Sequence, residues 1–387
     1  MKKKIAILGS TGSIGKSLIN ILKKDKNEIE VVLLTTNTNY RELKKQVKLF
    51  KVKNIIINDY KVFLILKEFY KNEKVNVYNN FDNFKKIFKS KIDYVMSAIS
   101  GFDGLKPTID IIKYTKKIAI ANKESIICGW SLIDNNLKKY KSQFVPIDSE
   151  HFSIWSLIND TKNINIEKVF ITASGGPFKE FPLSNFKSIT PRQALKHPSW
   201  SMGNKISIDS ATMMNKVFEI IEAKKIFDFN YNQLDIIIHP QSYVHAIIKF
   251  TNGLVKILVH ETDMKIPIFN SLYPNFEKMI KTKKIDFKIL NNLNFQKVDQ
   301  KRFPIIKLIK ALPKNESLFE TVIVAANDCL VEKFLEKKIK FIDISKFFFR
   351  IVNSKKFQKY KLKRPTNIEE IKSLNEYVRL KTNNLCV

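Results

Sequence analysis

Residues 3–22, KKIAILGSTGSIGKSLINIL, place three glycines between a strand-like run and a helix-like run. The apolar run IAIL leads directly into Gly9, Gly12 and Gly15, and a stretch with helical periodicity follows. Glycine lets a backbone approach a pyrophosphate closely, and the first N–H groups of a helix bind anions. The spacing is G-x-x-G-x-x-G, whereas the common dinucleotide fingerprint is G-x-G-x-x-G, so a simple tight turn is the alternative. Its place after the first strand favours a nucleotide-binding turn.

A second strand-like run, residues 30–34, ends without a carboxylate. NAD enzymes usually carry an acidic residue there, which binds the ribose 2′-hydroxyl and would repel a 2′-phosphate. Here the run continues into TTNTNYR, residues 35–41. Hydroxyl and amide side chains with Arg41 nearby favour NADP over NAD.

The length of 387 residues predicts two or three domains. The net charge of +31 comes almost entirely from lysine, since only six of the 68 basic residues are arginine. The lysines are spread along the chain, and sequence-specific nucleic-acid readers rely on arginine forks. We therefore expect a solvated lysine surface and no nucleic-acid partner.

Cys128, Cys329 and Cys386 form no C-x-x-C pair, so they predict neither a disulfide framework nor a thiolate metal site. The first strand begins within five residues, which leaves no room for a signal peptide, and no apolar run approaches 18 residues. These features predict a soluble, cytoplasmic protein without a membrane partner.

The pattern along the chain predicts an α/β protein with three domains. Strand-like and helix-like stretches alternate over residues 1–148, which is typical of a Rossmann-like, NADP-binding doubly wound sheet. Mixed strands and a strong helix near Ala211–Phe227 predict an α+β domain over residues 149–273. Residues 274–300 have the composition of a linker, and residues 301–387 predict a C-terminal helical domain.

Polar clusters in the first two domains could carry chemistry. ANKES, residues 121–125, follows a strand at the carboxyl end of the sheet, where open α/β sheets bind ligands. An exposed polar turn is an equally good interpretation of this segment. Asp148 and Glu150 would point the same way on an extended strand and could share one cation. Solvated or helix-capping carboxylates are the alternative for that pair.

The densest cluster spans residues 197–223. Asn215 and Glu219 are four apart on the predicted helix with Lys216 beside them, so amide, carboxylate and ammonium face one side. Ser210 opens that helix and would then be an N-cap. Oxygen ligands and hydrogen-bond donors from these clusters suit a divalent metal beside an anionic, phosphorylated substrate. The set is Asp148, Glu150, Ser174, His197, Asn215, Lys216 and Glu219.

The segments GSTGSIG, ANKES, DSEH, ASGGPF, HPSWSMGNKISIDSATMMNK and HPQSYVH occur in the order and at about the spacing found in the 1-deoxy-D-xylulose 5-phosphate reductoisomerase family. The chain resembles this family over essentially its whole length, and the long histidine-to-lysine segment is the most specific part. The resemblance implies an NADP-dependent oxidoreductase and a homodimer. Its small phosphorylated sugar substrate, 1-deoxy-D-xylulose 5-phosphate, would be rearranged to an aldehyde and reduced with NADPH to 2-C-methyl-D-erythritol 4-phosphate, for non-mevalonate isoprenoid biosynthesis.

The resemblance also implies roles for individual residues. The α+β domain would be catalytic, and Mg²⁺ or Mn²⁺, with Co²⁺ as an alternative, would bind Asp148, Glu150 and Glu219, which with Lys123 would carry the chemistry. Trp200 and Met202 would belong to a closing flap. Substrate contacts would be Lys123, Ser149, Glu150, Ser174, His197, Trp200, Met202, Ser210, Asn215, Lys216 and Glu219. NADPH contacts would be Gly9, Thr11, Gly12, Ser13, Ile14, Asn37, Thr38, Asn39, Asn122, Glu124 and Gly203.

The chain departs from the family pattern at two places. Asn37–Asn39 stands where the family usually has a glycine and often a basic residue, and Arg41 could substitute there. Val217 stands where glycine is usual. Two other functions are alternatives. A non-catalytic, lysine-rich binding protein on a dehydrogenase fold would not need every position that matches the family. A metal-free NADP dehydrogenase would not explain why three carboxylates converge.

Overall fold

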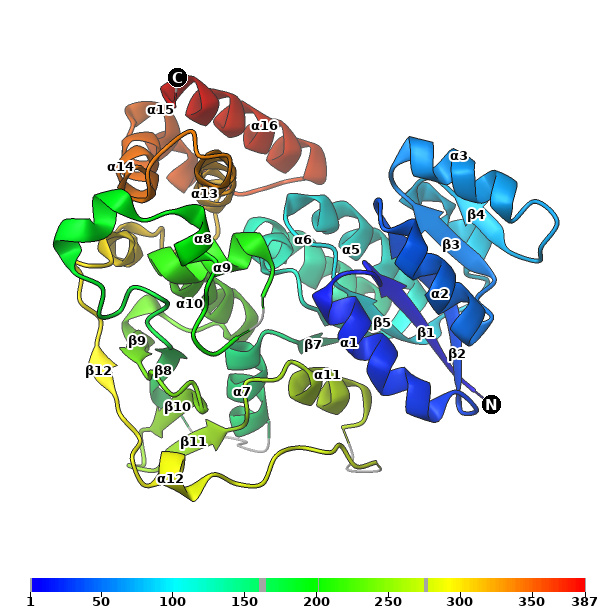
Figure 1. Ribbon diagram of the computed structural model, residues 1–387, viewed down its shortest axis with the longest axis horizontal. Coiled ribbons are helices and arrows are strands. Elements are labelled where there is room, and N and C mark those ends of the chain that lie inside the picture. Colours follow the sequence, from blue (N-terminus) through cyan, green and yellow to red (C-terminus); the bar gives the residue numbers. More distant parts are fainter. Residues whose placement is uncertain (1, 160–164, 201, 275–277, 387) are drawn as a thin grey trace. The chain divides into compact units, whose positions relative to one another are not determined.

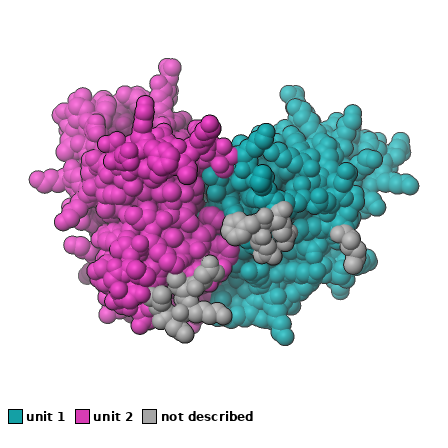
Figure 2. Space-filling view, turned by 90° about the horizontal axis from the view of Figure 1, so that it is seen from below, with its two compact units in different colours: residues 1–125, 132–148, 264–281 teal, residues 126–131, 149–263, 282–387 magenta. Residues whose placement is uncertain are grey.

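The computed structural model describes residues 2–159, 165–200, 202–274 and 278–386 (Figure 1). The chain divides into two compact units, which Figure 2 colours separately. The first comprises residues 1–125, 132–148 and 264–281, and the second comprises residues 126–131, 149–263 and 282–387. None of the described helices combines the length and apolar character needed to cross a membrane.

The first unit contains a seven-stranded sheet in the order β4-β3-β2-β1-β5-β6-β7, with every pairing parallel. The strand order reverses beside β1, and in such doubly wound sheets ligands bind at the carboxyl end of this position. The Rossmann-like prediction is therefore confirmed. The strands are β1 Lys3–Leu8, β2 Ile29–Thr36, β3 Asn54–Ile57, β4 Asn76–Tyr78, β5 Ile92–Ser97, β6 Thr115–Ile120 and β7 Gln143–Pro146. The helices are α1 Ser13–Leu22, α2 Tyr40–Phe50, α3 Tyr60–Phe69, α4 Phe84–Ile87, α5 Leu105–Ile111, α6 Lys123–Tyr140 and α11 Lys265–Leu272.

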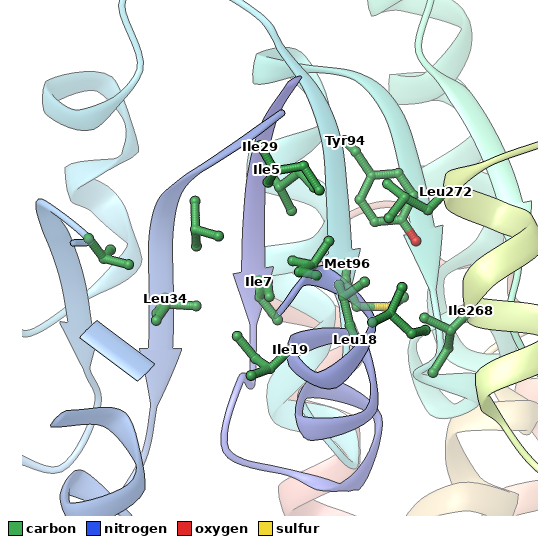
Figure 3. Packing of buried hydrophobic residues seen from close by; sticks show 14 of the residues in the cluster. Ile5, Ile7, Leu18, Ile19, Ile29, Leu34, Tyr94, Met96, Ile268 and Leu272 are labelled. Carbon is green, nitrogen blue, oxygen red and sulfur yellow. The ribbon is translucent and has the colours of Figure 1, made fainter. Parts of the chain in front are cut away.

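The core of the first unit includes a helix from far along the chain. Ile7 of β1 and Leu18 of α1 are fully buried in one cluster with Ile268 and Leu272 of α11 (Figure 3). This packing places residues 264–281 in the first unit, whereas the predicted boundaries put residues 264–273 in the second domain and began a linker at 274. The reason is that the apolar face of α11 is buried against α1 and the sheet, a contact that local patterns do not encode.

The second unit is built on a five-stranded sheet in the order β11-β10-β8-β9-β12. Among the strand pairs of the described residues, β8 and β9 are parallel and the other three pairs of this sheet are antiparallel. The strands are β8 Ile166–Ala173, β9 Leu234–Ile238, β10 Val244–Phe250, β11 Val255–Val259 and β12 Gln296–Lys297, the last from the predicted linker. The helices are α7 Ser149–Ile158, α8 Pro191–Ala194, α9 Asn204–Thr212, α10 Met214–Phe227, α12 Phe287–Leu290, α13 Phe319–Leu335, α14 Phe341–Val352, α15 Lys355–Gln358 and α16 Ile368–Leu385. In the C-terminal helical region, α13 packs against α14 and α16 (Figure 1).

Two local predictions were wrong. The helix expected over Ala211–Phe227 is two helices, because Met213 adopts a left-handed backbone conformation with φ of 66° between α9 and α10. Ser210 therefore lies inside α9 and is not the N-cap of the long helix. Glu150 was expected on a strand, but β7 ends at Pro146 and Glu150 lies in the first turn of α7, since Asp and Ser favour helix starts.

Candidate active site

The glycine turn after β1 contains two glycines that leave no room for a side chain, Gly9 and Gly15, and one that does, Gly12. Gly9 has a φ of +79°, and a Cβ there would lie 2.6 Å from the carbonyl oxygen of Ala98. A Cβ on Gly15 would lie 2.4 Å from the carbonyl oxygen of Gly9, whereas the nearest atom to a Cβ on Gly12 is 3.5 Å away. Gly12 is the N-cap of α1, and within the described residues no side chain caps this helix and no acidic residue stands in its first turn. The first N–H groups of α1 therefore suit a phosphate.

The end of β2 supplies hydroxyl groups to this turn. The Gly9 N–H donates to Thr35 Oγ1 at 2.8 Å, and the Thr11 and Thr36 hydroxyls are hydrogen-bonded at 2.7 Å. The side chain of Asn39 accepts a hydrogen bond from the Glu42 N–H and so caps α2. This cap is a structural role that the sequence reasoning missed.

Lys123 and Asp148 form a buried ion pair in the first unit. Lys123 Nζ donates to Asp148 Oδ2 at 2.9 Å, and the two side chains are only 8% and 13% exposed. Asn122 fixes the start of α6 beside them, because its Oδ1 accepts from the Ser125 N–H at 2.7 Å and its Nδ2 donates to the Gly101 carbonyl at 2.7 Å. The ANKES segment is thus a rigid helix start rather than an exposed turn.

In the second unit two buried carboxylates share one ammonium group. Lys216 Nζ donates to Glu150 Oε1 and to Glu219 Oε2, each at 2.6 Å. Carboxylate oxygens of the two glutamates lie within 4.8 Å of each other. Asn215 Nδ2 donates to the other oxygen of Glu219, and the Ser149 hydroxyl donates to Glu150. Asn215, Lys216 and Glu219 therefore meet on one side of their helix as expected, with the ammonium paired to both carboxylates.

His151 contacts the backbone of Glu219 and the side chain of Glu222, and the sequence analysis did not assign it a role. His151 Nε2 lies 2.9 Å from the backbone carbonyl of Glu219, and because a carbonyl only accepts, Nε2 carries a proton. His151 Nδ1 lies 3.2 Å from Glu222 Oε2, and both side chains are buried. The available signal was the histidine of DSEH, next to a predicted ligand.

His197 accepts hydrogen bonds at Nδ1 and donates one at Nε2, at the start of the segment that was predicted to be a flap. Its Nδ1 accepts from the backbone N–H groups of Ser199 at 3.1 Å and Trp200 at 2.9 Å, so the proton is on Nε2, which donates to Ser174 Oγ at 3.1 Å. Burial and the nearby Lys216 charge lower the pKa of His197 to about 4. The imidazole is therefore neutral near pH 7.

Among the described residues, the Ser174 hydroxyl has no acceptor for its own hydrogen. Its oxygen already accepts from His197 and from the Gly176 N–H at 3.1 Å. Gly176 has a φ of +65°, and a Cβ there would lie 3.0 Å from the Ser210 carbonyl oxygen, so this turn packs on the last turn of α9. The second unit thereby brings the turn that carries Ser174 close to Ser210.

Trp200 and its neighbours form the segment that was predicted to be a flap. The Trp200 ring meets His245 edge to face at 5.9 Å, and His245 stacks on His260 at 3.7 Å. Gly203 is the N-cap of α9, and Met202 is half-buried. Residue 201 lies outside the described residues. The two stacked histidines, from β10 and the turn after β11, were not predicted.

Comparisons with known proteins agree along the whole chain. The family model for 1-deoxy-D-xylulose 5-phosphate reductoisomerase matches residues 5–129, and models for C-terminal domains of that enzyme match residues 144–227 and 260–381. The chain is 62% identical to the reductoisomerase of Pelagibacter ubique, with 100% of both chains covered. It is 37% identical to that of Sulfurihydrogenibium sp., with 92% of both covered.

Solved structures give the same result. A reductoisomerase from Zymomonas mobilis in complex with NADPH has a TM-score of 0.88 and 31% identity, covering 100% of this chain and 99% of that one. A reductoisomerase in complex with NADPH, fosmidomycin and magnesium has a TM-score of 0.91 and 29% identity, covering 99% and 98%.

Proposed function

This chain belongs to the 1-deoxy-D-xylulose 5-phosphate reductoisomerase family, and on that premise we propose how its residues share the reaction. The protein is an NADPH- and divalent-metal-dependent enzyme that converts 1-deoxy-D-xylulose 5-phosphate to 2-C-methyl-D-erythritol 4-phosphate. The alternative of a non-catalytic lysine-rich binding protein is not favoured. The observation that carries the assignment of roles is the buried Glu150–Lys216–Glu219 arrangement.

We assign Glu150 and Glu219 as metal ligands, together with Asp148, which stands two residues before Glu150 in the chain. Carboxylate oxygens are the donors that Mg²⁺ and Mn²⁺ prefer, and the two glutamates already hold a cationic group. When bound, the metal polarises the substrate oxygens and stabilises the negative charge that develops as the carbon–carbon bond breaks. Asn215 and His151 hold the side chain and backbone of Glu219, so its carboxylate is pre-oriented.

The phosphate end of the substrate is proposed to lie against the Ser174–Ser210 side of the second unit. Neutral His197 donates a hydrogen bond to the Ser174 oxygen, so the Ser174 hydroxyl can donate its own hydrogen to a phosphate oxygen. Lys216 adds positive charge and exchanges its carboxylate partners for substrate oxygens. Lys123, oriented by Asp148, is proposed to bind substrate oxygens as well.

NADPH is proposed to place its pyrophosphate at the start of α1 beside Gly12, with Thr11, Ser13 and Ile14. The predicted contacts from Asn37, Thr38, Asn39, Asn122, Glu124 and Gly203 stay predictions. The Trp200 segment, fixed at its start by His197, is proposed to exclude water during hydride transfer.

The decisive experiment measures NADPH oxidation with 1-deoxy-D-xylulose 5-phosphate, with chelator and with added Mg²⁺ or Mn²⁺. Glu219→Gln should lower turnover by about 10² or more, as expected for losing a strong electrostatic stabiliser, while NADPH still binds. Glu167→Gln is the control. Glu167 is an exposed residue of β8, and its carboxylate pairs with Lys249 of β10. If Glu219→Gln binds Mn²⁺ as tightly as the wild type and turns over normally, the proposed ligand set is wrong.

A homodimer is proposed from the edge of the second sheet. β11 is the end strand, and Val255, Ile257 and Val259 on it are 54%, 45% and 39% exposed. An exposed apolar edge strand suits pairing with the same strand of a second copy. Ile257→Lys should shift sedimentation toward monomers, and an unchanged sedimentation profile would place the contact elsewhere. The cytoplasmic location and the absence of membrane and nucleic-acid partners stay predictions.

A further inference from the structure

A buried polar network joins α9 to α13 inside the second unit. Asp209 directly precedes Ser210 and is only 2% exposed. Its Oδ1 accepts a hydrogen bond from Asn327 Nδ2 at 2.7 Å, and its Oδ2 accepts from Lys205 Nζ at 2.9 Å. Lys205 Nζ also lies 3.1 Å from Asp328 Oδ1. Both oxygens of one buried carboxylate are thus held, one of them by a helix 118 residues further along the chain.

This network lies directly behind the proposed phosphate side. α9 ends three residues after Asp209, at Thr212, and α10 follows after Met213. The Ser210 carbonyl oxygen would lie 3.0 Å from a Cβ on Gly176, so the end of α9 stands close to the turn that carries Ser174. Because a buried carboxylate without partners is costly, Asp209 cannot rotate away, and the last turn of α9 is held in one position.

We propose that Asn327 is a positioning residue for substrate phosphate, acting through Asp209 on Ser210 without touching the substrate. The inference rests on the proposed function, specifically on Ser210 contacting the phosphate end. Asn327 is fully buried in α13, so the C-terminal helices set the affinity for the phosphate. The chemical step, at Glu150 and Glu219, does not depend on this network.

The test is Asn327→Leu, which keeps the volume and removes the donor. We expect KM for 1-deoxy-D-xylulose 5-phosphate and the inhibition constant of inorganic phosphate to rise about tenfold, the scale of one lost hydrogen bond to a charged group. We expect kcat and KM for NADPH to change by less than about twofold, because weaker phosphate binding that is shared by the ground state and the transition state raises KM and leaves kcat unchanged. Asn375→Leu is the matched control, because Asn375 is a buried asparagine of α16 in the same helical region. It should leave all four constants near the wild-type values.

A double-mutant cycle with Ser210→Ala separates the possible failures. If Asn327 acts through Ser210, Asn327→Leu should add little to KM in the Ser210→Ala background. Equal effects in both backgrounds, or a fall in kcat with unchanged KM, overturn the inference. If Ser210→Ala alone leaves KM unchanged, the proposed phosphate contact fails and the inference with it. Should Asn327→Leu not fold, Asn327→Ser is measured in the same way.

Discussion

Removing the ammonium of Lys216 should make the protein's stability depend strongly on metal. Lys216 is 8% exposed and lies 2.6 Å from an oxygen of Glu150 and of Glu219. The two carboxylates lie within 4.8 Å of each other, so without the ammonium they repel by roughly 3.5 kcal/mol at an effective dielectric constant of about 20. Removing one partner of a buried ion pair typically costs about 3–5 kcal/mol, which agrees.

The assay for Lys216→Met is denaturant unfolding in chelator and again with saturating Mn²⁺. In chelator the free energy of unfolding should fall by about 3–5 kcal/mol relative to the wild type. A metal at about 100 times its Kd adds about 2.7 kcal/mol to a protein that binds it only when folded. Mn²⁺ should bind the variant more tightly than the wild type, since a competing positive charge is gone, so it should restore more stability in the variant. Turnover should be lost, because Lys216 is a proposed substrate contact.

Lys225→Met is the matched control. Lys225 is another buried lysine with two carboxylates, at 2.9 Å from Glu316 and 3.6 Å from Glu320, and its side chain is 6% exposed. It should destabilise the protein by a similar amount with no extra gain from Mn²⁺. The reasoning is refuted if Lys216→Met is as stable as the wild type in chelator, or if Mn²⁺ stabilises both lysine variants equally.

Three other predictions test separate parts of the site. Gly12→Val should weaken NADPH binding in a fluorescence titration while leaving thermal stability and Mn²⁺ affinity near wild type, because there is space beside Gly12, whereas Gly15→Ala should lower stability through its backbone clash; unchanged NADPH affinity in Gly12→Val would contradict this. The pKa of His197, about 4 when folded against 6.5 ordinarily, means that the unfolded chain takes up the proton first. The stability that this group contributes should be fully present above pH 6.5 and be lost as the pH falls toward 4, so the stability difference between wild type and His197→Gln should shrink over that window; a constant difference would argue against a neutral imidazole. The absence of a carboxylate after β2 predicts that kcat/KM is at least about tenfold higher with NADPH than with NADH, roughly 1.4 kcal/mol, and comparable rates would show that Asn37–Asn39 relaxes selectivity.

The parallel sheet and the site segments were predictable because they follow local rules. Alternating strand and helix patterns encode a doubly wound sheet, and the i, i+4 spacing of Asn215 and Glu219 encodes a shared face of α10. Contacts between distant segments were not predictable. The burial of α11 in the first unit and the Asn327–Asp209 hydrogen bond depend on how the chain returns in space, which no periodicity records.

The break between α9 and α10 was missed for a different reason. TMMN contains no glycine or proline, so nothing in the local composition marks Met213 as a left-handed residue. That break is what allows Asn215 and Lys216 to start a new helix beside the glutamates. Val217, which replaces the family's usual glycine, is fully buried at the same point of α10. Its side chain therefore fills core volume, and the Lys216 contacts with both glutamates are in place next to it in the chain.

The unusual glycine spacing has a physical explanation in the turn itself. Gly9 supplies the positive φ and the close approach to Ala98, and Gly15 supplies the close packing of α1 on the turn. These are the roles of the first and last glycine in the common dinucleotide fingerprint. The middle glycine only has to leave room for the ligand at the helix start, so the chain can carry one more residue between the first and the middle glycine while the spacing from the middle to the last glycine stays the same. Gly12 does so as the N-cap of α1, and the G-x-x-G-x-x-G pattern therefore meets the same three requirements as the common fingerprint.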